Sequence, residues 1–181
     1  MKHVLIVYAS REGQTRAIAN RISEHLREAG LVVTRVDAAD RAATESIDLE
    51  RHDLLVFGAS LHAGGLEREI RAFVQAHAQQ IEKRPRSFFL VSLSAATKDP
   101  RVRAEFLADA RRKLNRQIPV VFEDTEMIAG ALRYSKYPLP LKWLMRRIAA
   151  EAGEETETSR DYEFTDWEQV ERYAERLATL V

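Results

Sequence analysis

The chain has 181 residues, no cysteine, and 28 basic side chains against 28 acidic ones, so its formal net charge is zero. This balance argues against a surface built as a whole to bind nucleic acid, and we expect no nucleic-acid partner. The lack of cysteine excludes disulfides, thiolate nucleophiles and iron–sulfur ligation, and the length suits a single domain spanning residues 1–181.

Five continuously apolar segments predict buried β-strands, and segments of helical period separate them. The predicted strands are 3–9, 31–37, 53–59, 87–93 and 126–132. The predicted helices are 15–30, 66–81, 100–116 and a last helix that starts at residue 165. Buried strands without polar alternation are typical of a parallel sheet covered by helices on both faces. The sequence therefore predicts an α/β fold, a doubly wound three-layer sandwich with ligands beyond the carboxyl ends of its strands.

Two side chains of the predicted helices have specific expected positions. His77 falls on the apolar stripe of the helix 66–81, so we expect a packed core histidine. The sequence TDWE predicts a capping box that opens the last helix, with Thr165 as N-cap and Glu168 reaching back to it. Residues 133–163, between the fifth strand and this helix, are too long for an ordinary loop and predict an insertion.

The loop after the first strand, Ser10–Thr15, has the composition of a phosphate site. Gly13 allows close approach to a ligand, Ser10 and Thr15 supply hydroxyl donors, and the following helix supplies its positive end. The loop lacks the lysine of a P-loop and the glycines of a dinucleotide fingerprint. A single terminal phosphate fits this pattern best, although the same turn can also exist without a ligand.

This loop and the five predicted strands resemble the flavodoxin family, whose corresponding loop binds the phosphate of FMN. Ser10, Gly13, Gln14 and Thr15 match the family pattern, whereas Glu12 departs from it. The resemblance implies FMN as cofactor, the strand order 2-1-3-4-5, and contacts along Ser10, Arg11, Glu12, Gly13, Gln14 and Thr15. Because a carboxylate repels phosphate, we expect Glu12 to turn its side chain away, toward Arg11, and to bind through its N–H.

The resemblance also implies that two further loops flank the flavin ring. Their expected contact residues are Ala59, Ser60, Leu61 and His62 in one loop, and Ser92, Leu93, Ser94 and Ala95 in the other. Neither loop has an aromatic residue, which leaves room for a substrate over the ring. His62 is a weak candidate for proton handling, because imidazole titrates near neutral pH; a surface histidine without a role explains it equally well.

No further catalytic residue is assigned, and we expect no metal. The remaining histidines show no ligand spacing among themselves or with carboxylates.

Four sequence segments extend the resemblance over essentially the whole chain. They are SREGQTR after the first strand, GAS at 58–60, IAGALRY at 128–134 and YEFTDWEQV at 162–170. Together they resemble the flavodoxin-like, quinone-dependent protoporphyrinogen oxidases of bacterial haem synthesis. The resemblance implies oxidation of protoporphyrinogen IX, with electrons passing to menaquinone or ubiquinone at the cytoplasmic side of the inner membrane, where the protein is peripheral. An electron-transfer flavodoxin and an NAD(P)H:quinone reductase are alternatives, and the sequence leaves open whether the protein forms homo-oligomers.

The first half of the insertion combines basic and apolar side chains without any acidic residue. The candidates for substrate or membrane contact there are Arg133, Tyr134, Lys136, Tyr137, Lys142, Trp143, Arg146 and Arg147. Such a segment suits a membrane surface, and its cations also suit the carboxylates on the rim of a tetrapyrrole. A helix packed on the domain with a solvated basic edge has the same composition.

Overall fold

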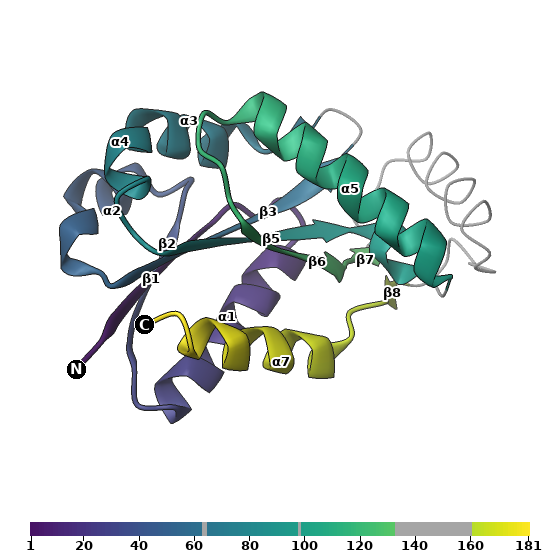
Figure 1. The fold of residues 1–181 in the computed structure, drawn as a ribbon, viewed down its shortest axis with the longest axis horizontal. Helices are drawn as coiled ribbons and strands as arrows, with labels where there is room; N and C mark the ends of the chain where they lie inside the picture. The colour runs from purple at the N-terminus through teal and green to yellow at the C-terminus, as the bar shows by residue number, and fades with distance from the viewer. Residues whose placement is uncertain (63–64, 98, 133–160) are drawn as a thin grey trace.

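Five parallel strands form the central sheet of the computed structural model, which describes residues 1–62, 65–97, 99–132 and 161–181 (Figure 1). They are β1 (His3–Tyr8), β2 (Val32–Asp37), β3 (Leu54–His62), β5 (Arg86–Ser92) and β6 (Asp124–Ala129). Their order is β2-β1-β3-β5-β6, and a two-residue strand, β4 (Gly65–Leu66), pairs antiparallel with the end of β3. Counted over the five parallel strands, this is the predicted order 2-1-3-4-5, so the predicted fold class is confirmed.

Helices cover both faces of the sheet (Figure 1). One face carries α1 (Gln14–Glu28) and α7 (Trp167–Ala178), which pack against each other. The other face carries α2 (Arg41–Ser46), α3 (Arg68–Ala76), α4 (Ala78–Ile81) and α5 (Pro100–Gln117), with short 3-10 turns η1 (Leu49–Arg51) and η2 (Leu93–Ala96). Among the described helices, none has the length and apolar character needed to cross a membrane.

The apolar strands divide their side chains between two cores because successive residues point to opposite faces. In β1, Val4 and Ile6 pack toward α1 and α7, whereas Leu5 and Val7 pack toward the other helical layer. All four side chains are fully buried. This two-sided burial explains why the strand shows no polar alternation.

The predicted helix 66–81 is broken, which corrects the assignment of His77. His77 ends α3 and precedes α4, and it is half-buried rather than packed in the core. Its ring centroid lies 4.6 Å from that of Phe73, and its Nδ1 lies 3.0 Å from Gln80 Oε1. The polar partner keeps the imidazole at the surface although its sequence spacing is that of a core position.

The predicted capping box is also wrong, because the N-cap of α7 is Asp166. The Asp166 carboxylate accepts the N–H of Gln169 at 3.0 Å. The Thr165 hydroxyl has other partners: it accepts from Gln14 Nε2 at 2.8 Å and donates to the Ala129 carbonyl of β6 at 2.8 Å. Glu168 instead pairs with Arg172 at 3.6 Å.

The two ends of the predicted insertion lie side by side. The chain leaves β6 after Ala129, so the predicted strand 126–132 is shortened at this end, and β7 (Ala131–Leu132) pairs antiparallel with β8 (Tyr162–Glu163). The Phe164 N–H then donates to the Gly130 carbonyl at 3.0 Å. The eight substrate or membrane candidates between Arg133 and Arg147 lie outside the described residues.

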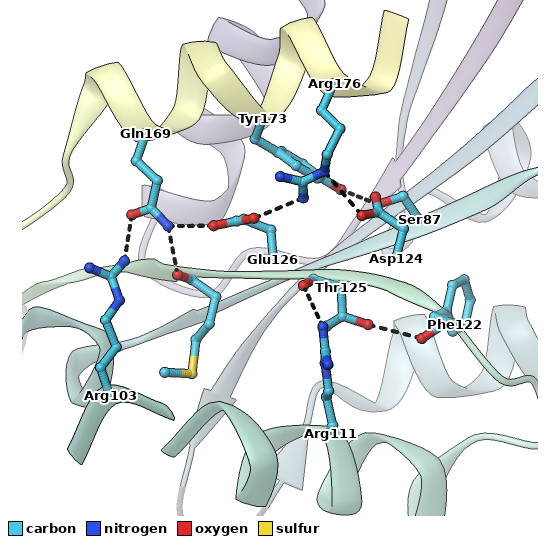
Figure 2. Close-up of polar contacts among 11 residues, drawn as sticks. Ser87, Arg103, Arg111, Phe122, Asp124, Thr125, Glu126, Gln169, Tyr173 and Arg176 are labelled. Carbon is cyan, nitrogen blue, oxygen red and sulfur yellow. Dashed lines mark hydrogen bonds and ion pairs between the residues drawn. The ribbon is translucent and has the colours of Figure 1, made fainter. Parts of the chain in front are cut away.

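Side chains from both helical layers bond the outer edge of β6 (Figure 2). An edge strand presents carbonyls without a ladder partner. Arg111 of α5 donates to the Thr125 carbonyl at 3.3 Å, and Gln169 of α7 donates to the Met127 carbonyl at 3.1 Å. These bonds attach α5 and α7 to the edge strand and blunt its tendency to pair with another chain.

Candidate functional site

The residues predicted to bind a ligand lie at the carboxyl ends of β1, β3 and β5 and therefore at one edge of the parallel sheet. The predicted strand 53–59 extends to His62, so the four residues predicted as a second loop, 59–62, are the end of β3. Tyr8 is level with Gly58, and Ser60 is level with Val91, so the strands end close to one another. A direct contact joins the start of α1 to the end of β3: the hydroxyl oxygens of Thr15 and Ser60 are 3.0 Å apart. The structure thus brings together predicted residues that are far apart in sequence.

The first loop turns sharply at Gly13, which has a φ of 100° and serves as the N-cap of α1. Residues with an L side chain rarely adopt this backbone conformation, so the position favours glycine. A Cβ at Gly13 would meet nothing within 4 Å, so the space over the turn is open. An open space over a helix N-terminus is the shape that an anion requires.

The turn is held by the Ser10 hydroxyl, and its donors remain available to a ligand. Ser10 Oγ accepts the N–H groups of Gly13 at 3.1 Å and Arg16 at 3.3 Å. Because its oxygen acts as acceptor in both bonds, the Ser10 O–H can still donate. Only one proton is used between Thr15 and Ser60; because Thr15 is fully buried and Ser60 is half-buried, Ser60 is the hydroxyl of this pair that can face a ligand. The residues present therefore fit a phosphate monoester.

The two arginines of this region differ in their availability to a phosphate. Arg16 pairs with Asp37 at 3.1 Å, and the hydrogen bond to Asp37 raises the pKa of Arg16. Arg11 is exposed and makes no ion pair with any described residue. Arg11 is thus the cation of the loop left to face a phosphate.

Arg11 and Glu12 differ in exposure. Arg11 is exposed, whereas Glu12 is half-buried beside it. Exposure does not show where the Glu12 carboxylate points, so its expected turn away from the phosphate, toward Arg11, stays a prediction.

Gln14 links the loop to the far side of the site, a contact that the sequence did not predict. The side chain of Gln14 is buried, and its Nε2 donates to Thr165 Oγ1 at 2.8 Å. The Thr165 hydroxyl in turn donates to the Ala129 carbonyl. A hydrogen-bonded chain therefore joins Gln14 at the start of α1, Thr165 before α7 and the end of β6.

The second and third loops present few side chains to a ligand. Ala59 and Ala95 are buried in the core, and Leu61 packs partly against it. Ser92 caps η2 by accepting the N–H of Ser94 at 3.3 Å. Because the side chains of Ala59 and Ala95 are buried, these residues can offer a ligand only their backbone groups. The His62 side chain is exposed. The site roles predicted for these loops stay predictions.

A buried carboxylate beside His62 escaped the sequence analysis. Glu67 is 4% exposed, and its Oε1 lies 3.5 Å from His62 Nε2. The two residues meet across the β3–β4 hairpin, where Leu61 pairs with Leu66. The sequence spacing of His62 and Glu67 is not that of a known motif. Their proximity follows from the β3–β4 hairpin, which would have had to be predicted first.

Other parts of the described chain offer no competing site. No group of three or more histidine, aspartate or glutamate side chains among the described residues is arranged to hold a metal. A groove of about 870 Å³ lies between α2 and α3, lined by Ala38, Ala72, Phe73 and neighbouring residues. It shares no residue with the three loops, so we assign no role in the site to it.

Comparison with known proteins gives consistent matches. Residues 5–159 match the family model described as flavodoxin domain. The chain is 32% identical over 176 residues to protoporphyrinogen IX dehydrogenase (quinone) of Escherichia coli strain K12, covering 97% of this chain and 94% of that protein. It is 29% identical to the Leishmania major protein of the same name, covering 97% and 74%.

Among solved structures, a short-chain flavodoxin associated with a non-canonical PDU bacterial microcompartment is similar in fold. It matches with a TM-score of 0.57 and 15% identity, over 99% of this chain and 98% of that one. At this identity the likeness concerns the fold alone.

Proposed function

The chain belongs to the flavodoxin family, and from this premise we propose that it is an FMN-dependent dehydrogenase that oxidises protoporphyrinogen IX with a quinone as electron acceptor. The observation that carries the proposal is the length of the likeness to the E. coli dehydrogenase, which includes nearly all of both proteins. A likeness limited to the flavin-binding loops would fit any flavodoxin. This one extends through the insertion and the last helix.

FMN is the cofactor that the family and the first loop both fit. The Ser10 hydroxyl, the backbone at Gly13 and the positive end of α1 would hold its phosphate, with the buried Thr15 hydroxyl behind them. Arg11 supplies an opposite charge at the exposed side of the loop. When bound, FMN supplies a ring that takes up a hydride and returns the electrons to a second acceptor.

The protein's own part in the reaction is to position the substrate and leave one side of the site open. Ala59 and Ala95, fixed in the core, hold the backbone of the two flanking loops. The sequences of these loops contain no aromatic residue that would cover a bound ring. A flat tetrapyrrole can therefore approach the edge of the sheet where the three loops meet.

We place the quinone reaction at a membrane surface, with the protein peripheral on the cytoplasmic side of the inner membrane and menaquinone or ubiquinone as acceptor. Support comes from the composition of the segment 133–147, which joins cations to Trp143 and other apolar residues. Further support comes from β7 and β8, which hold the two ends of the insertion together. The hydrogen bond between Gln14 and Thr165 connects the paired ends of the insertion to the phosphate loop.

An anaerobic half-reaction tests the proposed activity. Protein loaded with FMN is mixed with protoporphyrinogen IX, and the loss of the oxidised flavin absorbance is followed. A menaquinone analogue is then added, and the absorbance should return. NADPH serves as the comparison donor: a flavin that is reduced by NADPH and stays oxidised with the porphyrinogen would identify an NAD(P)H:quinone reductase and refute the proposal.

Deletion of Lys136 to Arg147 tests the membrane proposal separately. The deleted protein should retain FMN with an unchanged flavin-to-protein ratio but lose its association with anionic liposomes and its turnover with a membrane quinone. A full-length variant with Lys136, Lys142, Arg146 and Arg147 changed to glutamine shows whether liposome association depends on the positive charges or on the presence of the segment. Loss of FMN on deletion would show that the segment serves the domain itself.

A further inference from the structure

Glu67 is a buried carboxylate whose oxygens no described residue satisfies. Its side chain is 4% exposed, and neither Oε1 nor Oε2 accepts a hydrogen bond. Burying an ionised carboxylate without hydrogen bonds is costly, so such groups usually have a paired charge or a function. The buried Glu67 carboxylate therefore requires either a paired charge nearby or a function.

Helix capping does not account for Glu67. The residue occupies the N-cap of α3, yet its side chain makes no cap hydrogen bond. Arg71, one turn later, forms no ion pair with it, and the Arg71 Nε is itself buried without a partner. The polar group that does approach the carboxylate is His62 Nε2, at 3.5 Å.

The approach of Glu67 leaves the other nitrogen of His62 free. A carboxylate beside Nε2 favours the tautomer with its proton on Nε2, so Nδ1 carries the lone pair. No described residue bonds Nδ1, and the His62 side chain is 40% exposed. A base at the end of β3, with one ring nitrogen facing a carboxylate and the other open, is suited to accept a proton from a bound molecule.

We propose that His62 accepts a proton from the porphyrinogen, and that Glu67 is a positioning residue that orients the imidazole and stabilises its cation. This rests on the proposed function. Each two-electron oxidation removes one C–H hydrogen as hydride, with its electron pair going to the flavin, and one proton from a pyrrole N–H or a methylene carbon. His62 Nδ1 takes that proton and then releases it to solvent, so the imidazole returns to its starting state.

The other charged groups on the packed elements set the electrostatic context. β3 before His62 and β4 carry none, and Gln117 of α5, which accepts the Leu66 N–H at 2.9 Å, is neutral. Arg68, Glu69 and Arg71 follow on α3, and Arg11 and Glu12 lie on the phosphate loop. None of these charged side chains is within ion-pair distance of the His62 imidazole, whereas Glu67 is.

Four FMN-loaded variants test the pair. His62→Gln and Glu67→Gln remove the base and the charge, while His77→Gln and Glu69→Gln make the same changes outside the pair. The rate of flavin reduction by protoporphyrinogen IX is measured anaerobically across pH. We expect His62→Gln to lose about 10²- to 10⁴-fold in rate, the range of general base catalysis, with an unchanged flavin-to-protein ratio. Glu67→Gln should also lower the rate, because the imidazole then loses the carboxylate that faces its Nε2, whereas Glu69→Gln should leave the rate unchanged.

A second readout is independent of turnover. The imidazole nitrogen resonances of the FMN-loaded protein are recorded by NMR, and the signals absent from His62→Gln identify His62. These nitrogen shifts report which ring nitrogen carries the proton, and they should change in Glu67→Gln and stay in place in Glu69→Gln. An unchanged tautomer in Glu67→Gln overturns the role of Glu67. Full-rate flavin reduction in His62→Gln overturns the role of His62, whereas a wild-type flavin that protoporphyrinogen does not reduce refutes the proposed function instead.

Discussion

The Ser87 hydroxyl bridges the buried Tyr173 and the half-buried Asp124, and its removal should cost more stability than the loss of either bond alone. Ser87 Oγ lies 2.5 Å from Tyr173 Oη and 2.5 Å from Asp124 Oδ2 (Figure 2). An ionised carboxylate only accepts, so Ser87 donates to Asp124 and accepts from Tyr173. Burial raises the pKa of Tyr173, which keeps its hydroxyl protonated as a donor.

The two single variants should differ clearly in the free energy of unfolding. Tyr173→Phe removes one hydrogen bond and leaves Ser87 bonded to Asp124, at a cost of about 1 kcal/mol. Ser87→Ala removes both bonds and leaves the Tyr173 hydroxyl, in a residue 1% exposed, without an acceptor. A lost bond to a charged group and a buried unsatisfied hydroxyl together cost about 2–4 kcal/mol. Asp124 retains its contact with Arg176 Nε at 3.1 Å in both variants.

Urea denaturation at pH 7, followed by circular dichroism, measures these differences. The decisive variant is the double substitution, because Tyr173→Phe removes the hydroxyl that Ser87→Ala leaves unsatisfied. We expect Ser87→Ala/Tyr173→Phe to be at least as stable as Ser87→Ala alone. Additive losses in the double variant, or a Ser87→Ala cost no greater than that of Tyr173→Phe, would refute the reasoning.

Three further substitutions test the site and its support. Gly13→Ala should cost about 1–2 kcal/mol of stability, because the backbone φ of 100° strains an alanine even though the space around a Cβ is open. The same change should weaken FMN binding in a fluorescence titration. Unchanged affinity would show that the turn does not hold the phosphate. Gly58→Ala should lower stability to urea by about 1–3 kcal/mol or more, since the new Cβ would lie 1.9 Å from the Phe89 ring; a neutral result would mean that the ring moves freely. Burial lowers the pKa of His52, so its contribution to stability is present above about pH 6.5 and is lost as the pH falls. His52→Gln should therefore flatten the decline in the free energy of unfolding between pH 7 and pH 5, whereas parallel declines would contradict this assignment.

The fold was predictable because its evidence is local and repeated. The apolar run of β1 buries residues on both faces, so a continuous run indicates a central parallel strand without knowledge of its neighbours. The turn at Gly13 was predictable for the same reason, since glycine, hydroxyl residues and a following helix suffice to describe it.

Contacts between distant segments were not predictable from pattern alone. Thr165 has the sequence of an N-cap, but the Ala129 carbonyl lies near enough to bond its hydroxyl, and Asp166 caps the helix instead. His77 has core spacing, yet Gln80 gives it a polar partner at the surface. Glu67 follows a hairpin whose register brings it to His62, and a one-residue shift in that register would place it on the opposite face.

The pairing of β7 with β8 brings together the two ends of the segment between them. Leu132 and Tyr162 are directly opposite each other in an antiparallel pair, which is the geometry that a two-residue turn such as Asn-Gly closes. A chain in which such a turn replaces residues 133–161 would keep the strand order of the sheet. Comparing its FMN affinity with that of the intact chain would measure how much of the proposed cofactor site the sheet and its edge supply without the insertion.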